Sequence, residues 1–300
     1  MDPIKCLDHG FVELVDAMGD DQSILRAARV SYAKEEVVRS AKDDRALIRY
    51  LMRMRHTTPF ESVVFVFHMK MPIFVARQAV RHRMSSINEV SARYTELPQE
   101  FYTPMPEHVQ YQATTNKQGR SGVMDDAAEQ SGDFNIDANS AFESYRRRLD
   151  AGMAKELARI NLPLSTYTRW HQKFDLHNLF HFLGLRLDKH AQYEIRVFAE
   201  AMAFFVKDRC PLAWEAFEDF RLNAMSFSAV ELKVLRRMMK NSVDLFVDHE
   251  DRLVVPSVVL MSASVGCVAT TWIEDAGAEW PTAREREEFV AKIKTLLASD

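Results

Sequence analysis

The sequence predicts a mixed α/β fold, because strand-like and helix-like stretches alternate along its first two thirds. Residues 61–69 form a run of β-branched and aromatic side chains, the strongest strand pattern in the chain. Residues 175–183 and 188–209 instead repeat apolar side chains at helical spacing. The Gly-x-Gly-x-x-Gly fingerprint of a Rossmann sheet does not occur. We therefore expect strands and helices without a doubly wound parallel sheet.

Length and composition indicate a globular protein of the reduced cytoplasm. The chain has 300 residues, of which 47% are apolar, enough for one large domain or two small ones. Its three scattered cysteines, Cys6, Cys210 and Cys267, argue against a disulfide scaffold. The net charge of −4 counts against a general nucleic-acid binder, which is usually basic. The first residues contain no apolar signal region.

One uncharged stretch, residues 253–273, is long enough to cross a bilayer. Pro256, Gly266 and several hydroxyl side chains interrupt it, and its flanks are mostly acidic. Membrane orientation normally relies on flanking lysine and arginine. We therefore expect a buried helix or a pair of strands here, and no membrane span.

Caps and breakers set the order of elements in the first eighty residues. We expect a strand, a helix, a second helix, a strand and a third helix, in turn at 11–15, 21–30, 44–56, 61–69 and from Pro72 onward. Asp20 or Asp21 is suited to cap the first helix. Pro59 limits the second, because the residue before proline avoids helical geometry. Pro72 suits the first turn of the third helix.

The later elements follow from the same signals. Residues 111–135 are polar and glycine-containing, which predicts an exposed loop, and helical patterning resumes near Ala138. We expect this helical pattern to continue through 154–160 and to stop by Pro163, followed by a strand at 167–170, a helix capped by Asp175 and a long helix at 188–209. Capping boxes at 228–231 and 282–285 predict a mainly helical extension over residues 221–300, without an assignable role, after a first domain over residues 1–220.

Residues 81–94 concentrate the functional side chains of the sequence. Three arginines, one histidine and one acid occur within fourteen residues. Such a run cannot be buried unpaired, because isolated buried charge costs more than folding can recover. It is therefore a solvated face or a binding site for an anion. Charge alone favours the solvated face, in which arginines complement the C-terminal end of a helix.

The order of these residues resembles the signature of the flavin-dependent thymidylate synthases. In that family an Arg-His-Arg triplet is followed, after seven intervening residues, by a serine; here the triplet is 81–83 and the serine is Ser91. Asn88-Glu89 and Arg93-Tyr94 are also in place, whereas Ala92 stands where many members have glycine. Further stretches that resemble family motifs are 27–32, 56–61, 183–186 and 190–194, so the resemblance covers roughly residues 8–220.

This resemblance implies the thymidylate synthase-complementing fold, a mixed and mainly antiparallel sheet with packed helices. It also implies reductive methylation of dUMP to dTMP. The carbon would come from 5,10-methylenetetrahydrofolate and the hydride from FAD that NADPH has reduced. The family forms homotetramers whose sites lie between subunits. The implied partners are therefore dUMP, folate and further copies of the chain, with no nucleic acid and no membrane.

The site residues are carried over from the family position by position. The implied dUMP site comprises Gln78, Ala79, Val80, Arg81, Glu89, Val90, Ser91, Ala92, Arg93, Arg159 and Arg186. The implied FAD site comprises Thr58, Arg81, His82, Arg83, Glu89, Asp175, Leu176, His177 and His181. Arg186 is the expected catalytic residue, because a preorganised cation stabilises negative charge on the activated uracil. His56 and Tyr94 are candidates for stacking on flavin or folate rings.

The sequence also allows three other interpretations: a metal site, a cysteine nucleophile and a nucleic-acid-binding regulator. His177 and His181 are spaced to share a metal, but Asn178 stands where a metalloprotease needs glutamate and spacing fixes no third ligand, so we expect no metal. No cysteine has the electropositive setting of a nucleophile, and Cys210 is expected at a helix C-terminus. We therefore expect a reaction without an enzyme nucleophile. The remaining alternative is a nucleic-acid-binding regulator that uses an arginine-rich helix.

Overall fold

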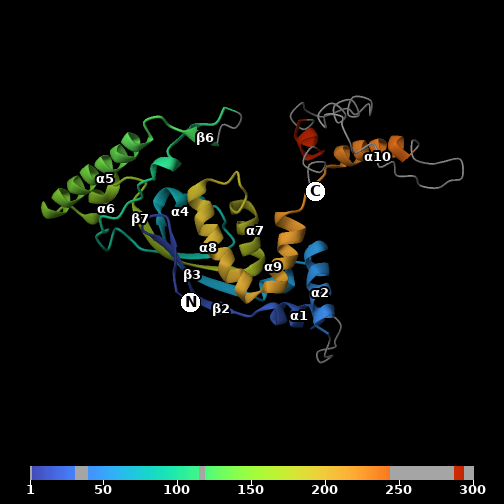
Figure 1. The fold of residues 1–300 in the computed structure, drawn as a ribbon. Helices are drawn as coiled ribbons and strands as arrows, with labels where there is room; N and C mark the ends of the chain where they lie inside the picture. Colours follow the sequence, from blue (N-terminus) through green and yellow to red (C-terminus); the bar gives the residue numbers. More distant parts are fainter. Residues whose placement is uncertain (1, 31–39, 115–118, 244–286, 294–300) are drawn as a thin grey trace, which may run out of the picture. The chain divides into compact units, whose positions relative to one another are not determined.

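The computed structural model describes residues 2–30, 40–114, 119–243 and 287–293. The chain divides into two compact units, Met1–Asn223 and Ala224–Asp300 (Figure 1). The assignment of residues 1–220 as the catalytic domain and of 221–300 as an extension of unknown role stays a prediction.

The first unit is built on a five-stranded sheet with the order β1-β2-β3-β7-β4, in which every neighbouring pair is antiparallel. The strands are β1 (Ile4–Cys6), β2 (Gly10–Met18), β3 (Val64–Pro72), β4 (Ser86–Glu89) and β7 (Tyr167–Asp175). The predicted mixed and mainly antiparallel fold is confirmed. The expected strand at 61–69 lies three residues further along the chain, and the one at 167–170 continues to Asp175.

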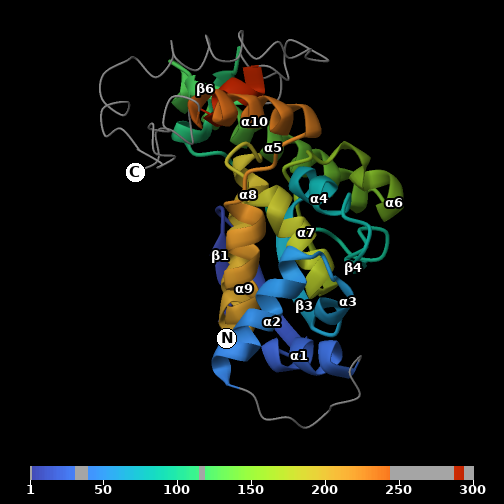
Figure 2. The same ribbon diagram turned by 90° about the vertical axis from the view of Figure 1, so that its right-hand side faces the viewer.

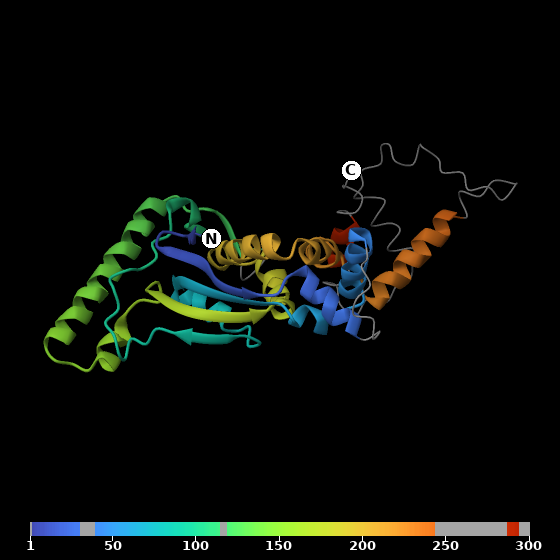
Figure 3. The same cartoon turned by 90° about the horizontal axis from the view of Figure 1, so that it is seen from below.

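Alternation along the central strands decides which side chains enter the core. Phe67 and Met69 of β3 and Trp170 of β7 are buried on one face of the sheet. His68 and His171 are cross-strand partners on the other face, where their rings stack with centroids 4.8 Å apart. Figure 3 shows the helices of residues 176–217 on one side of the sheet, while no described helix covers the opposite face.

Two consecutive helices pack on the buried face, α7 (Leu176–Arg186) and α8 (Tyr193–Arg209), and α9 (Pro211–Phe217) follows and packs against α2 and α8 (Figure 2). Asp175 starts α7 as predicted, since its carboxylate accepts a hydrogen bond from the Asn178 backbone N–H at 2.9 Å. The helix expected at 188–209 begins only at Tyr193, because Asp188 instead accepts the His190 N–H at 2.7 Å and closes a turn.

The N-terminal helices are α1 (Asp21–Val30), α2 (Ala41–Arg53) and α3 (Thr58–Glu61). Asp20 caps α1 by accepting the N–H groups of Gln22 and Ser23 at 3.0 and 3.2 Å, as expected. A capping box between Ser40 and Asp43 starts α2 three residues earlier than predicted. The family-like residues 31 and 32 lie outside the described chain.

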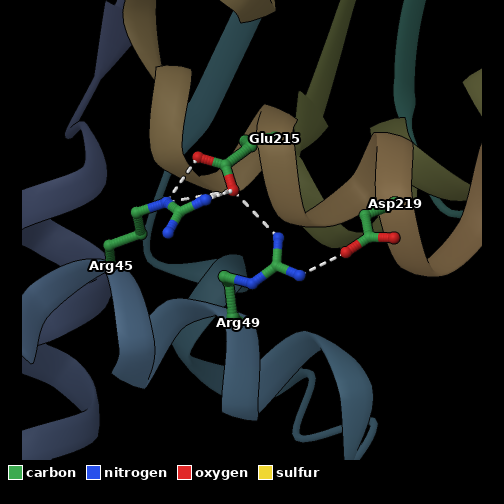
Figure 4. Close-up of polar contacts among 4 residues, drawn as sticks. All are labelled: Arg45, Arg49, Glu215 and Asp219. Carbon is green, nitrogen blue, oxygen red and sulfur yellow. Dashed lines mark hydrogen bonds and ion pairs between the residues drawn. The ribbon is translucent and has the colours of Figure 1, made fainter. Parts of the chain in front are cut away.

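Charged side chains join α2 to the C-terminal end of this unit (Figure 4). Arg45 and Arg49 reach Glu215 of α9 at 2.6 and 2.9 Å, and Arg49 also pairs with Asp219 in the π-helical turn η3 (Glu218–Leu222). These pairs are substantially exposed to solvent. They therefore orient the two helices more than they stabilise the fold.

The polar stretch 111–135 is not one exposed loop, so that prediction is wrong. It contains parts of a hairpin, β5 (Gln110–Gln112) and β6 (Arg120–Val123), and the first turns of α5 (Ala127–Asp150). The buried side chains of α5 include Ala138, Phe142 and Tyr145, which form a separate small core with Phe101 and Ala158. A helix that packs along one narrow stripe needs few apolar residues, which is why its polar beginning resembles a loop.

The arginine-rich stretch is not helical, which corrects a second expectation. Pro72 ends β3 and caps α4 (Ile73–Ala79), which stops before Arg81. Arg81, His82 and Arg83 then form an irregular turn, and the chain returns as the edge strand β4, which was not predicted. The remaining short elements are η1 (Pro106–His108), α6 (Lys155–Ala158) and η2 (Arg159–Asn161). The helical pattern expected to continue from Ala138 through 154–160 is interrupted, because α5 ends at Asp150 and Gly152 takes a left-handed backbone with φ of 81°.

The second unit contains α10 (Ala229–Val243) and a helix at 287–293. The capping box predicted at its start is confirmed, because Ser228 and Glu231 exchange side-chain to backbone hydrogen bonds. Val234 packs against Phe289 and Ile293. The second capping box and the uncharged stretch 253–273 lie outside the described residues. No helix of the described chain has the length and hydropathy needed to cross a membrane.

Asp21 connects the first and last helices of the first unit. Asp21 is 7% exposed, and its carboxylate accepts hydrogen bonds from the backbone N–H groups of Leu212 and Ala213, at 2.8 and 3.0 Å. These two N–H groups belong to the first turn of α9, where no intrahelical acceptor exists. A side chain of α1 therefore supplies the N-terminal cap of α9.

We predict that Asp21→Ala destabilises the protein, because it leaves these N–H groups without an acceptor. The free energy of unfolding should fall by about 1–3 kcal/mol in urea denaturation. Glu143→Ala, on the exposed side of α5, is the matched control and should change it by less than about 0.5 kcal/mol. Equal stability of both variants would show that water satisfies the start of α9.

Candidate active site

Two helix ends meet at the proposed catalytic residue. Arg186 is the last residue of α7, and its Nε donates to His82 Nε2 at 3.1 Å. Its Nη2 donates to the backbone oxygen of Gln78, in the last turn of α4, at 3.5 Å. The His82 ring packs edge-on against Phe182 of α7, with centroids 4.9 Å apart. The structure therefore brings Gln78, His82 and Arg186 together.

The electrostatics of this cluster favour a neutral imidazole beside a cation. Burial, together with the neighbouring Arg186 and His181, lowers the pKa of His82 to about 4. At neutral pH its Nε2 therefore carries a lone pair that accepts the Arg186 N–H. Burial also lowers the pKa of Arg186, but a guanidinium stays charged. The cluster thus holds one partly buried positive charge whose orientation a neutral partner fixes.

A cavity of about 380 Å³ lies beside this cluster. Its lining residues are Leu51, Met52, Arg55, His56, Thr57, Phe60, His177, Phe180, His181, Gly184, Leu185, Phe217 and Arg221. His181 links the two regions, since its ring lies 5.8 Å from that of His82. Among the described residues, no group of three His, Cys, Asp or Glu side chains is placed to hold a metal.

The implied FAD residues differ in how they relate to this cavity. His177 and His181 line it, and Thr58 follows the lining residue Thr57 at the start of α3. Asp175 and Leu176 serve the fold: both Asp175 oxygens accept from Asn178, and Leu176 is fully buried. Arg81 and Arg83 are exposed in the turn after α4.

Two arginines of the cavity wall were missed by the sequence analysis. Arg55 has a left-handed backbone with φ of 59°, a conformation that is uncommon outside glycine. Arg221 lines the same cavity, and burial together with the nearby Arg55 lowers the pKa of its guanidinium. Arg55 directly precedes the family-like stretch 56–61, and this position could have identified it as a site residue from the sequence. Arg221 follows the end of the resemblance and had none.

The implied phosphate ligands lie at the other end of β4. Val90 donates its N–H to the Arg169 oxygen at 2.9 Å, so strand pairing continues to the residue before Ser91. Arg93 Nε lies 3.6 Å from a Glu156 oxygen of α6, and Arg159 follows α6 directly. Four residues of strand span roughly 13 Å. Within one protomer, Ser91, Arg93 and Arg159 therefore lie apart from the Arg186 cluster.

The implied nucleotide residues between these groups are held by the sheet and the core. Glu89 accepts a hydrogen bond from Thr168 Oγ1 at 2.6 Å. Ala79 is the last residue of α4 and is buried in the core. Val80 lies in the turn after α4. The only non-glycine residues with positive φ in the described ranges are Leu7 and Arg55. Ala92 therefore needs no glycine-specific conformation, and its departure from the family pattern carries no backbone penalty.

A hydrogen-bonded group behind Gln78 was not assigned from the sequence. Gln78 Nε2 donates to Gln192 Oε1 at 2.5 Å, and Gln192 Nε2 donates to Glu194 Oε2 at 2.7 Å. Glu194 in turn accepts from Arg120 of β6. Gln192, Glu194 and Arg120 also line a second cavity, of about 750 Å³. The family-like stretch 190–194 contains two of these residues, whereas Arg120 lies in the stretch expected to be a loop.

The described cysteines are inert by their surroundings. Burial and the nearby Glu200 raise the pKa of the Cys6 thiol to about 12, and burial raises that of Cys210. Cys210 ends α8 as expected, but it also precedes α9, so it occupies a helix start as well as a helix end. Asp21 and Asp20 oppose any thiolate there. Cys267 lies outside the described residues.

Comparison with known proteins agrees with this arrangement. Residues 13–212 match the family described as thymidylate synthase complementing protein. A flavin-dependent thymidylate synthase of Gluconobacter oxydans is 51% identical over 242 residues, covering 79% of each chain. The corresponding protein of Thermus thermophilus is 51% identical over 240 residues, covering 80% of this chain and 87% of that one.

A solved structure is similar in fold as well as in sequence. It is the UMP/dUMP methylase PolB from Streptomyces cacaoi bound with 5-Br dUMP, at a TM-score of 0.68 and 36% identity. The match covers 73% of this chain and 99% of that one. Sequence, fold and the position of the Arg-His-Arg turn all lead to one conclusion: the chain belongs to the thymidylate synthase complementing protein family, the flavin-dependent thymidylate synthases.

Proposed function

We propose that this protein methylates dUMP to dTMP, with 5,10-methylenetetrahydrofolate as carbon donor and FAD, reduced by NADPH, as hydride source. The observation that carries the proposal is the convergence of Gln78, His82 and Arg186 beside a cavity, in a chain of this family. A regulator that reads nucleic acid through an arginine-rich helix lacks support, because that stretch is a turn and a strand. Two buried free cysteines suit a cytoplasmic enzyme.

The residues of the smaller cavity fit a flavin cofactor. Phe60 and Phe180 give it an apolar floor, while the cations Arg55 and Arg221 lie close together at its wall. Neighbouring cations suit a ligand with negative phosphates. We assign FAD contacts to Thr58, Arg81, His82, Arg83, His177 and His181. Asp175 and Leu176 directly precede His177, whereas Glu89 lies at the far end of β4 and would have to reach a flavin of another protomer. When bound, the flavin supplies the hydride chemistry that no side chain can perform.

The nucleotide site is proposed to form between protomers. Ser91, Arg93 and Arg159 offer the hydroxyl and guanidinium donors that a phosphate dianion prefers. Arg93 is available because its pairing with Glu156 is long and exposed, at 3.6 Å. Gln78 and Arg186 would receive the pyrimidine, but they lie beyond β4 in the same protomer. A homotetramer, in which Arg186 and Arg93 of different copies face one nucleotide, resolves this separation.

Arg186 is proposed to act by electrostatic stabilisation. Its Nε is engaged by the neutral His82, so the planar guanidinium is held in one orientation before substrate arrives. A fixed positive charge in a partly desolvated position stabilises negative charge that develops on the pyrimidine. No thiol with a lowered pKa stands in the described chain to attack the ring. The side chains therefore bind, orient and stabilise, and none needs to form a covalent bond.

The function is tested by an absorbance spectrum and an activity assay. The purified protein should bind flavin with bands near ~370 and ~450 nm. It should form dTMP from dUMP only when methylenetetrahydrofolate and NADPH are both present. A colourless protein that binds no added FAD, yet retards DNA in a gel, would establish the regulator instead.

We predict that Arg186→Ala impairs turnover far more than nucleotide binding. The loss of one preorganised donor costs on the order of 3 kcal/mol, about a hundredfold in rate. Arg186→Lys should restore only part of it, because lysine lacks the planar fork. Arg93→Ala should mainly weaken dUMP affinity. Single-turnover flavin oxidation and equilibrium binding separate the two effects; a wild-type single-turnover rate in Arg186→Ala would remove Arg186 from the chemistry.

We also predict that Cys6→Ala, Cys210→Ala and Cys267→Ala each retain turnover within about threefold, because the Cys6 and Cys210 thiols are not activated and the sequence around Cys267 carries no charge. Cys210→Ala should lower the melting temperature, because it removes a buried side chain. The measurement is dTMP formation at saturating substrates on folded, flavin-loaded protein. A single replacement that abolishes turnover without unfolding would identify an enzyme nucleophile.

A further inference from the structure

The buried carboxylate of Glu194 organises three donors behind the Gln78 side chain. Glu194 is 2% exposed and lies in the first turn of α8. Its Oε2 accepts from Arg120 Nη2 at 2.5 Å and from Gln192 Nε2 at 2.7 Å, and its Oε1 accepts from the Tyr102 hydroxyl at 3.3 Å. Arg120 supplies the compensating charge that a buried carboxylate requires.

A carboxylate with these partners determines which way two amides point. Because a carboxylate only accepts, Gln192 must turn its NH₂ toward Glu194 and its Oε1 away. That Oε1 accepts from Gln78 Nε2 at 2.5 Å, so Gln78 must turn its own NH₂ toward Gln192. An isolated amide flips at little cost, but reversing either one here would place two acceptors or two donors face to face.

The orientation leaves a defined pair of polar atoms on Gln78. Its Oε1 makes no hydrogen bond within the described residues, and its second N–H is also unused there. The side chain is half-buried, and its backbone oxygen accepts from Arg186. Gln78 therefore offers an acceptor and a donor, side by side and in fixed order, next to the cation proposed to meet the pyrimidine.

We infer that Arg120, Glu194 and Gln192 are positioning residues that lock the Gln78 amide and thereby make the nucleotide site select uracil over cytosine. Uracil presents N3–H, a donor, beside a carbonyl acceptor. Cytosine presents the reverse order, with N3 as an acceptor beside an amino donor. A locked amide matches one base only, whereas a free amide turns to match either. The inference rests on the proposed nucleotide site at Gln78 and Arg186.

Arg120 and Tyr102 reach the Glu194 carboxylate from distant parts of the chain. Arg120 and Glu194 are separated by 74 residues, and Arg120 reaches the carboxylate from the β5–β6 hairpin while its Nη1 donates to the His108 oxygen at 3.1 Å. Burial and the nearby Glu194 raise the pKa of Tyr102, so its hydroxyl remains a donor at neutral pH. All of these groups act through Gln78, and none of them needs to touch the substrate.

The test compares dUMP and dCMP affinity on the flavin-loaded enzyme by calorimetry. Gln192→Leu and Glu194→Met each break the chain at a different link. Each should reduce the ratio of dUMP to dCMP affinity by about tenfold or more, because the site's discrimination by paired hydrogen bonds is lost. Glu194→Gln should keep most of the ratio, since its amide oxygen can still accept from Arg120 and Gln192.

Matched controls separate selectivity from general damage. Glu215→Met removes a carboxylate from the other arginine cluster of this unit (Figure 4) and should leave the ratio at its wild-type value. Flavin absorbance and melting temperature report whether each variant is folded. If Glu194→Met does not fold, Gln192→Leu alone decides the outcome.

Three results would count against the inference or its basis. A wild-type ratio in Gln192→Leu overturns the inference. An equal weakening of dUMP and dCMP in that variant also overturns it, because this is what a purely structural role produces. If Gln78→Ala itself leaves dUMP affinity and selectivity unchanged, the proposed nucleotide site is what fails, while dTMP formation by the wild-type protein still tests the proposed function separately.

Discussion

The antiparallel ladder between β3 and β7 is the constraint on which the rest of the first unit depends. It runs without interruption from Val64 opposite Asp175 to Pro72 opposite Tyr167. Each strand therefore delivers its following helix to an opposite end of the sheet. α4 begins where β3 ends, and α7 begins where β7 ends. The eleven residues of α7 cover about 16 Å, which is the distance that brings Arg186 back to the turn after α4.

The residues proposed for chemistry take little part in holding this framework together. Phe65, Phe67 and Phe174 fill the core between sheet and helices, whereas Arg81 and Arg83 lie exposed at its edge. Neither arginine forms an ion pair within the described residues. Exposed arginines without acidic partners contribute little to the stability of a fold, and the net charge of −4 shows that the chain as a whole is not basic. We propose that they contact an anionic ligand.

Rigidity in this site comes from groups that only accept or only donate. The neutral His82 ring fixes Arg186 through one nitrogen lone pair, and the Glu194 carboxylate fixes Gln192 and Gln78 through its oxygens. In each case one partner has a single role, since the Arg186 guanidinium can only donate and the Glu194 carboxylate can only accept, and this restricts how the partner side chains can rotate. Preorganisation of this kind is needed where charge develops on a ligand during reaction.

The sequence by itself determined the features whose cause lies within a few residues. The caps of α1 and α7, the β-branched run of β3 and the spaced motif around Arg81 and Ser91 were all readable. These depend on local hydrogen bonds and side-chain periodicity, which neighbouring residues encode. The family resemblance then supplied the mainly antiparallel fold and the set of site residues, including Arg186.

Only the tertiary structure decided the features that join distant parts of the chain. The edge strand β4 has polar residues that no local rule identifies as a strand, and it exists because β7 lies beside it. The polar start of α5 belongs to a helix that joins the small core around Phe101 only from Ala138 onward, so its own residues carry no helical apolar pattern. Gln78 and Gln192 are 114 residues apart, and Arg120 and Glu194 are 74 apart. Hydrogen bonds across such separations leave no spacing in the sequence, because the fold, and not the chain, makes these residues neighbours.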